Sequence, residues 1–250
     1  MARRNELRDP TVLLCERCGY DLTGTPRDGK CAECGTPVGE SLPGRRIGTP
    51  FQQRTDPVTF VRTMWLLARR PRGVWDAVLP ERWHSGLFGF FCAVTASVFA
   101  WLGLANTAWG RPLRDPGADA AFLCMSAATC LVLTYIEMLG LRLIGRKNGW
   151  RITQEVSQAV CGHACVGWIV AGALVAVGWQ LGARLPAAPL VNNTPSWMNP
   201  IVTSLQFVLP GVGFFVGMMV FETLAYIGVR KLRWANVGEE TQWRSDAETE

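Results

Sequence analysis

The sequence predicts a mainly α fold: a polytopic helical membrane bundle of about four spans, preceded by a small β-hairpin zinc ribbon. Two observations predict it. Two C-x-x-C pairs lie near the start of the chain, and residues 86–229 contain long apolar runs with few ionisable groups, whereas residues 1–82 carry most of the charge. Runs of this length and composition are typical of membrane proteins. The charged and apolar parts of the chain therefore predict separate domains.

Four cysteines near the N-terminus form a candidate metal site over residues 12–38. Two residues separate the members of each pair and twelve separate the pairs; the four are Cys15, Cys18, Cys31 and Cys34. Two such turns can offer four thiolates to one tetrahedral ion, which suits zinc. A glycine follows each pair, at Gly19 and Gly35, where positive φ is expected. We expect one structural Zn²⁺ without an open position for catalysis.

An iron site of the rubredoxin type and a dithiol redox pair are the alternatives to zinc. A redox C-x-x-C is expected at the start of a helix after a strand, whereas the turn-rich GYDLTGTPRDGK favours a hairpin. The other five cysteines lie in apolar runs, where they are expected to act as small hydrophobic side chains. The first ten residues, MARRNELRDP, contain no apolar signal core, so the ribbon is expected in the reducing cytosol.

Two segments connect the ribbon to the apolar half of the chain. Residues 39–54 are rich in Pro and Gly and lack apolar periodicity, which predicts a flexible linker. Residues 55–84 are predicted to form an amphipathic neck. In the neck, Thr55 or Asp56 as N-cap before Pro57 predicts a helix that ends before the next proline, at about residue 70. Its arginines and its apolar row favour a position in the membrane interface, with packing on the bundle as the alternative. The apolar row consists of Val58, Val61, Trp65 and Ala68.

Four apolar stretches within residues 85–230 are each long enough to cross a bilayer, which takes about 20 helical residues. They are 86–109, 118–143, 160–181 and 201–228. Arg and Lys gather in the turn at 142–151 and after the last stretch, so the positive-inside rule places both termini in the cytoplasm. Residues 231–250 would form an acidic cytoplasmic tail. The PGVG run at Pro210 leaves open either one kinked span or a short external segment before a span.

Glu137, His163 and Glu222 are strongly polar residues that lie well inside the predicted spans. Ionisable groups in a membrane are candidates for function by default. The functional interpretation is a proton or cation relay. The structural interpretation, which we favour, is hydrogen bonding between helices.

Two parts of the sequence resemble known families. The ribbon begins C-x-x-C-G-Y-D-L and ends C-x-E-C-G, and it resembles ribbons fused to the front of many bacterial membrane proteins. The segments TDPVTFVRTMW, RPRGVWDAV and ITQEVSQAVCGHACVGWIVAGAL are similar to the Yip-type membrane family, over about residues 55–230. Members of that family usually show five spans, and its eukaryotic members help organise vesicle transport. The resemblance implies a helical membrane scaffold that faces the cytoplasm, without catalytic residues.

The leading hypothesis is a non-enzymatic scaffold or adaptor in the bacterial inner membrane. Its ribbon would dock a cytosolic protein, its bundle would contact the lipid bilayer, and a homo-oligomer is left open. The alternative is a small transporter or channel-like protein that uses the three intramembrane residues. An enzyme is not expected, because no nucleophile and base lie at a suitable spacing. Nucleic-acid binding is not expected either, because basic and aromatic residues are sparse in the ribbon.

Overall fold

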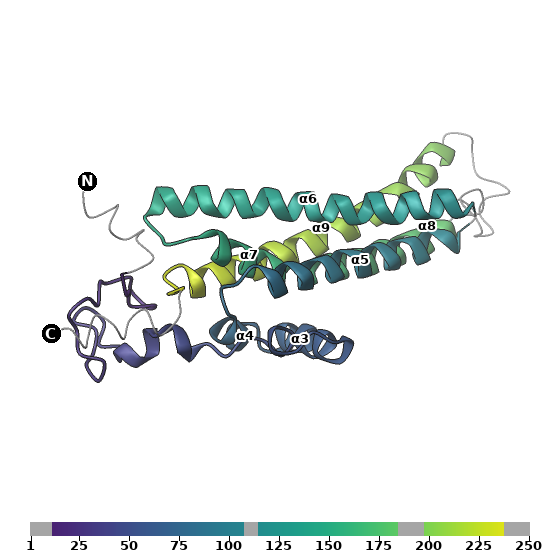
Figure 1. The fold of residues 1–250 in the computed structure, drawn as a ribbon. Helices are drawn as coiled ribbons and strands as arrows, with labels where there is room; N and C mark the ends of the chain where they lie inside the picture. The colour runs from purple at the N-terminus through teal and green to yellow at the C-terminus, as the bar shows by residue number, and fades with distance from the viewer. Residues whose placement is uncertain (1–11, 108–114, 185–197, 238–250) are drawn as a thin grey trace. The chain divides into compact units, whose positions relative to one another are not determined.

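The structure is a computed structural model, and it describes residues 12–107, 115–184 and 198–237 (Figure 1). The predicted acidic tail lies largely outside these residues. The chain divides into two compact units. Unit 1 comprises Met1–Phe88, Tyr135–His163 and Ala225–Glu250, and unit 2 comprises Gly89–Thr134 and Ala164–Leu224.

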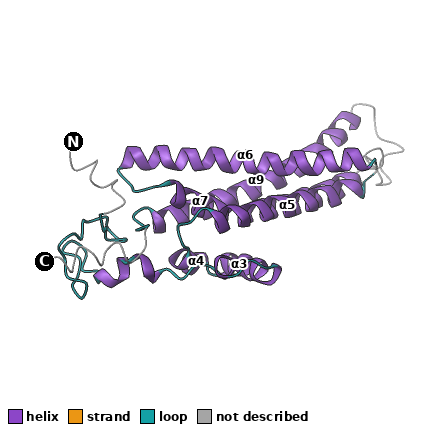
Figure 2. Ribbon diagram, in the orientation of Figure 1, coloured by secondary structure: helices purple, strands orange, loops and turns teal. Residues whose placement is uncertain are grey.

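The described residues contain helices and turns but no β-strand (Figure 2). The predicted β-hairpin of the zinc ribbon is therefore wrong. In its place are two isolated bridges, Leu14 to Asp21 and Lys30 to Pro37. Each bridge closes the short turn that contains one cysteine pair, and no strand continues from either bridge in the described residues.

Short helices in unit 1 follow the cysteine-rich segment. The helix α3 (Pro57–Arg69) confirms the predicted helix at about 57–70. Asp56 is its N-cap: its carboxylate accepts the Thr59 amide at 2.8 Å, and Pro57 occupies the first helical position, where no amide is needed. The next helix, α4 (Pro71–Ala77), also begins at a proline. The apolar row of α3 points to solvent in the isolated chain, because Val58 is 76% exposed and Trp65 is 56% exposed.

Residues 39–54, for which the composition predicted a flexible linker, carry several short elements. These are η1 (Val38–Ser41), η2 (Pro43–Arg45) and α2 (Pro50–Gln53). The Phe51 ring is 1% exposed and meets the Phe60 and Phe88 rings at centroid distances of 6.0 and 5.3 Å. The Gln52 amide nitrogen donates to the Leu79 carbonyl at 2.8 Å. The prolines and glycines of this segment thus form turns, and these turns direct side chains such as Phe51 into the protein interior.

Four helical segments among the described residues are long and apolar enough to cross a membrane, which confirms the predicted number. They are α5 (Trp83–Ala105), α6 (Pro116–Asn148), α7 with α8 (Gln154–Ala164 and Val166–Arg184) and α9 (Met198–Leu232). The last one runs through Pro210 as a single helix. This agrees with the alternative of one span for this stretch and not with a short separate segment before a span.

Small residues allow close helix packing within unit 2. A Cβ atom at Gly172 would lie 2.2 Å from the Ala96 carbonyl oxygen, and one at Gly217 would lie 2.3 Å from Ala171 Cα. Nearby, the Trp168 ring stacks on the Phe221 ring with a centroid distance of 4.9 Å. Backbones that approach this closely are typical of small-residue packing in membrane bundles.

Candidate metal site and the polar clasp

The four-cysteine module, which we define as residues 12–38, consists of two turns with one backbone pattern. In the first turn the Cys15 and Gly19 amides each donate to a carbonyl of the same turn at 2.8 Å. In the second turn the Cys31 and Gly35 amides do the same at 2.8 and 2.9 Å. Both glycines have positive φ, 80° and 70°, as predicted. Glycine adopts this conformation without steric cost, so the sequence repeat is a structural repeat.

The two turns bring four thiols together. The sulfurs of Cys15, Cys18, Cys31 and Cys34 all lie within 4.8 Å of one another. Cys15 Sγ lies 3.5 Å from Cys34 Sγ, and Cys18 Sγ lies 3.6 Å from Cys31 Sγ. A tetrahedral ion with metal–sulfur bonds of ~2.3 Å needs sulfurs ~3.8 Å apart, so the four thiols fit one ion. Within the described ranges, no other group of His, Cys, Asp and Glu side chains has this geometry.

The surroundings of the four thiols differ. Cys15 and Cys31 are buried, Cys34 is half-buried and Cys18 is exposed. Burial raises the pKa of Cys15. The hydroxyl and the backbone amide of Thr36 lower the pKa of Cys34 to about 6, and that hydroxyl oxygen lies 3.2 Å from the Cys34 sulfur. The contacts with Thr36 thus favour the thiolate form of Cys34.

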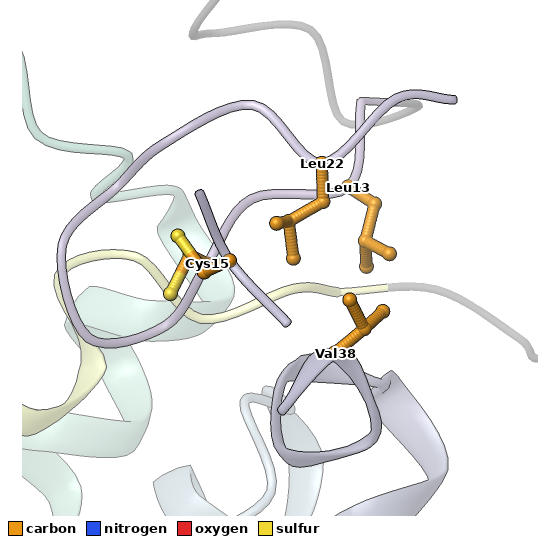
Figure 3. Close-up of a cluster of buried hydrophobic side chains, with 5 residues drawn as sticks. Leu13, Cys15, Leu22 and Val38 are labelled. Atoms are coloured by element: carbon orange, nitrogen blue, oxygen red, sulfur yellow. The ribbon is translucent and has the colours of Figure 1, made fainter. Parts of the chain in front are cut away.

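The apolar core of the four-cysteine module is small. Leu13, Leu22 and Val38 point toward one another beside Cys15 (Figure 3), and they are 8%, 2% and 1% exposed. Burying such a side chain stabilises a fold by about 1.5–3 kcal/mol. Ordering one backbone residue costs about 1–2 kcal/mol, so a core of this size cannot hold the module by itself. Other contacts must contribute.

A polar clasp, which we define as Asn236 with Arg151, Glu16 and Arg46, holds the four-cysteine module inside unit 1. Asn236 lies just beyond the end of α9 and is 2% exposed. Its Oδ1 accepts the Leu14 amide at 3.0 Å, and its Nδ2 donates to the Leu14 carbonyl at 2.7 Å. The side-chain amide therefore satisfies the backbone of Leu14 as a neighbouring strand would.

Arg151, in the turn before α7, ties the same asparagine to the start of the module. Its Nη1 donates to Asn236 Oδ1 at 3.0 Å and its Nη2 donates to the Val12 carbonyl at 2.6 Å. Its backbone amide donates to the Arg233 carbonyl at 2.9 Å. Arg151 is 3% exposed, so these bonds form away from water. One side chain thereby joins three segments that are distant in the sequence.

Arg46 and Glu16 form a buried ion pair on another side of the module. Arg46 Nη2 lies 2.7 Å from Glu16 Oε2, and the two side chains are 5% and 9% exposed. Arg46 Nη1 also donates to the Trp75 carbonyl at 2.9 Å and to the Val78 carbonyl at 3.3 Å. The arginine thus satisfies carbonyls at the C-terminal end of α4, where helical partners are lacking. It belongs to the segment for which a flexible linker was predicted.

The indole ring of Trp234 packs against the first turn of the four-cysteine module. A Cβ atom at Gly19 would lie 2.6 Å from Trp234 Cε2. Two features therefore require glycine at this position: the positive φ, and the indole ring, which occupies the space that a Cβ atom would need.

His163, the predicted intramembrane histidine on α7, is fully buried and takes part in packing. Its Nδ1 donates to the Ala159 carbonyl at 2.9 Å, and Nε2 lies 3.3 Å from the Thr49 hydroxyl oxygen, which can donate to it. Its ring stacks on Phe88 at a centroid distance of 5.2 Å, and Trp75 meets it edge-on at 6.0 Å. The ring is thus held by a hydrogen bond to each nitrogen and by two aromatic side chains.

Glu137 and Glu222 are both half-buried, on α6 and α9. Glu137 belongs to unit 1 together with His163, whereas Glu222 belongs to unit 2. The joint site that the sequence suggested for the three residues stays a prediction.

The fold and the site fit one class of protein: a helical membrane protein with a four-cysteine metal site. No family model matches the chain, and no curated protein and no solved structure is detectably similar to it. The resemblance to Yip-type proteins therefore remains a hypothesis.

Proposed function

We propose that this protein is a non-enzymatic integral membrane scaffold or adaptor whose four-cysteine module, folded around zinc, presents a fixed surface to a cytosolic protein. The polar clasp is the observation that carries this proposal. Asn236, just beyond the end of α9, bonds to Leu14 of the module. Arg46 joins Glu16 of the module to the Trp75 carbonyl of α4. A module held in this way can transmit position and orientation to a partner, which a module on a loose tether cannot.

Zinc is the ion that we propose for the four-cysteine site. Four thiolates in tetrahedral arrangement suit zinc, and zinc binding worth ~10–16 kcal/mol would supply the folding energy that the small core lacks. Iron binds a similar set of ligands, so metal analysis has to distinguish the two. With four protein ligands the ion has no open position, which supports a structural role and not a catalytic one.

The surface offered to the partner is the exposed part of the four-cysteine module. Tyr20 is 40% exposed, and Arg17 and Lys30 are also exposed. Aromatic and arginine side chains contribute much of the binding energy in protein interfaces. The density of positive charge is low for nucleic acid, so a protein partner is the better fit.

We place the protein in the bacterial inner membrane with both termini in the cytoplasm. The basic ends of α6 and α9 support this orientation, because positively charged helix ends stay on the cytoplasmic side. The expected thiolate chemistry of the four-cysteine site agrees with a reducing compartment. Reporter fusions at either end of the chain would test the orientation.

Crosslinking of the full chain in its native membrane, followed by identification of the bound proteins, tests the proposal. Three variants are compared with the unaltered protein: Cys18→Ala with Cys34→Ala, Tyr20→Ala with Lys30→Glu, and the control Arg72→Glu on α4. The first pair removes the metal, the second alters the exposed surface and keeps all four thiols. We expect one partner that both pairs lose and the control retains. If no partner is found, or if the Tyr20 and Lys30 pair binds it undiminished, the docking role is wrong.

A further inference from the structure

A polar cavity of about 360 Å³ lies within unit 1, beside the four-cysteine module. Its walls come from three places: the module itself, the segment that follows it, and the C-terminal ends of α4 and α9. A volume of this size is in the range of small-molecule sites. The proposed scaffold function gives this cavity no role.

Positive charge dominates the wall of the cavity, because five basic and three acidic side chains line it. Two of the acids are already paired: Glu16 with Arg46 at 2.7 Å, and Asp76 with Lys231 at 2.8 Å. A concave surface with an excess of one charge focuses the electrostatic field on its interior. The cavity therefore favours an anion.

Some arginines of this cavity are not used in ion pairs within the protein and can bind a ligand. Arg17 and Arg230 are exposed, and no carboxylate of the described residues forms an ion pair with either. The Arg230 guanidinium lies over the Tyr226 ring, 5.0 Å from its centroid, and this contact leaves its N–H groups available to donate to a ligand. Arg45 donates through Nη1 to the Glu40 carbonyl at 2.7 Å, which leaves its other guanidinium nitrogens available. The guanidinium fork matches two oxygens of one phosphate. Glu40 is the acid in the wall that opposes an anion.

The cavity also adjoins the end of a helix that is long and apolar enough to cross a membrane. Arg230 and Lys231 lie in the last turn of α9, at the end of the candidate span Ser204–Leu232. Basic residues at the cytoplasmic end of a span lie at the level of the lipid headgroups, where anionic lipids attract them. We propose that the cavity binds a phosphate-bearing anion, with Arg17 and Arg230 as the main ligands. A phosphodiester in the headgroup of an anionic phospholipid and a free phosphate compound share this chemistry.

The test uses the full-length, metal-loaded protein in nanodiscs. One arm compares discs of phosphatidylcholine with discs that also contain phosphatidylglycerol, and scores bound phospholipid by native mass spectrometry after release. The other arm titrates inorganic phosphate and glycerol 3-phosphate in phosphatidylcholine discs. Binding of phosphatidylglycerol alone identifies the lipid source, and binding of the soluble phosphates identifies the free source. If none of these probes binds, the proposal is wrong.

Charge variants test the residues. Arg17→Gln with Arg230→Gln should weaken binding at least about tenfold, because each removes a charge-assisted hydrogen bond. Arg72→Gln with Arg69→Gln, which removes as much charge outside the cavity, should change little. Glu40→Gln should tighten binding, and this gain guards against a loss that comes from misfolding alone. Equal weakening by both arginine pairs, or no gain for Glu40→Gln, would overturn the proposal.

Discussion

Leu14 and Asn236, 222 positions apart in the sequence, exchange two hydrogen bonds of 3.0 and 2.7 Å. The asparagine side chain completes the backbone of the four-cysteine module, and Arg151 fixes the same side chain from the turn before α7. The stability of the module therefore depends on residues that follow the last helix as well as on its cysteines.

The substitution Asn236→Ala should release the four-cysteine module. It leaves the buried amide and carbonyl of Leu14 without partners, which costs about 1–3 kcal/mol for each group. Hydrogen exchange of residues 12–46 in membranes should then become faster while the long helices keep their protection. Asn106→Ala is the matched control, because Asn106 lies just beyond the end of α5 and outside the clasp. Unchanged exchange in Asn236→Ala would contradict a structural role for the clasp.

The four-cysteine site should hold one zinc ion for each chain. We expect Cys31→Ser to lose the ion and to unfold the four-cysteine module, because a metal site supplies most of the folding energy in so small a core. Elemental analysis of the purified protein measures the metal and its identity. Cys124→Ser, at an exposed cysteine of α6, should keep a full complement. Iron in the unaltered protein, or zinc retained by Cys31→Ser, would count against the proposed site.

A methyl group at Gly19 should damage the contact between the four-cysteine module and Trp234. Gly19 and Gly24 have similar positive φ, 80° and 74°, but a Cβ at Gly24 has no atom within 4 Å, whereas one at Gly19 would lie 2.6 Å from the indole. Both alanine variants carry the backbone strain, of order 1–3 kcal/mol. The midpoint temperature at which heating releases zinc should therefore be lower in Gly19→Ala than in Gly24→Ala. The difference between the two midpoints reports the contact with Trp234. Equal midpoints would show that the ring can move aside.

The apolar row of α3 should lie in the lipid interface. Val61 is 61% exposed in the isolated chain, and its neighbour Arg62, which is also exposed, lies about 100° farther round the helix at the polar border of the row. A photo-crosslinking residue in place of Val61 should label phospholipid, because an amphipathic helix buries its apolar face among acyl chains. The same residue in place of Arg62 should label lipid far less. If neither position labels lipid, the interfacial hypothesis fails.

Transport through Glu137, His163 and Glu222 is the alternative function. Measurements of ion flux distinguish this transporter hypothesis from the scaffold hypothesis. The contacts of His163 with Thr49 and Phe88 favour packing, so we expect no proton or cation flux above that of empty liposomes. Flux that Glu222→Gln abolishes, while protein folding and zinc content stay unchanged, would favour a transporter.

Local signals in the sequence predict much of this structure. The four thiols were predictable because two turns of fixed spacing determine where their sulfurs lie. The helix α3 was predictable because Asp56 and Pro57 supply a cap and a start within two positions. The number of membrane-compatible helices follows from the length of apolar runs, which needs no knowledge of tertiary contacts.

The clasp was not predictable, because its residues have ordinary local contexts. Asn236 and Arg151 look like polar residues of turns next to spans, and only their distant partners give them a role. The composition of residues 39–54 predicted a flexible linker for a different reason. Pro and Gly make long helices and strands less favourable, but they do not prevent Phe51 and Arg46 from being buried. The predicted hairpin failed because turn-rich composition specifies reversals of the chain and not the length of the pairing between them.

The bonds between Leu14 and Asn236 also impose an order on biosynthesis. The four-cysteine module leaves the ribosome before the long helices, since chains are made from the N-terminus, yet the asparagine that completes its backbone is made only after the last helix. Until then, the Leu14 amide and carbonyl must be satisfied by water. A nascent chain that stalls before residue 236 therefore lacks the side chain that bonds to Leu14, which distinguishes its module from that of a finished protein before any partner has been engaged.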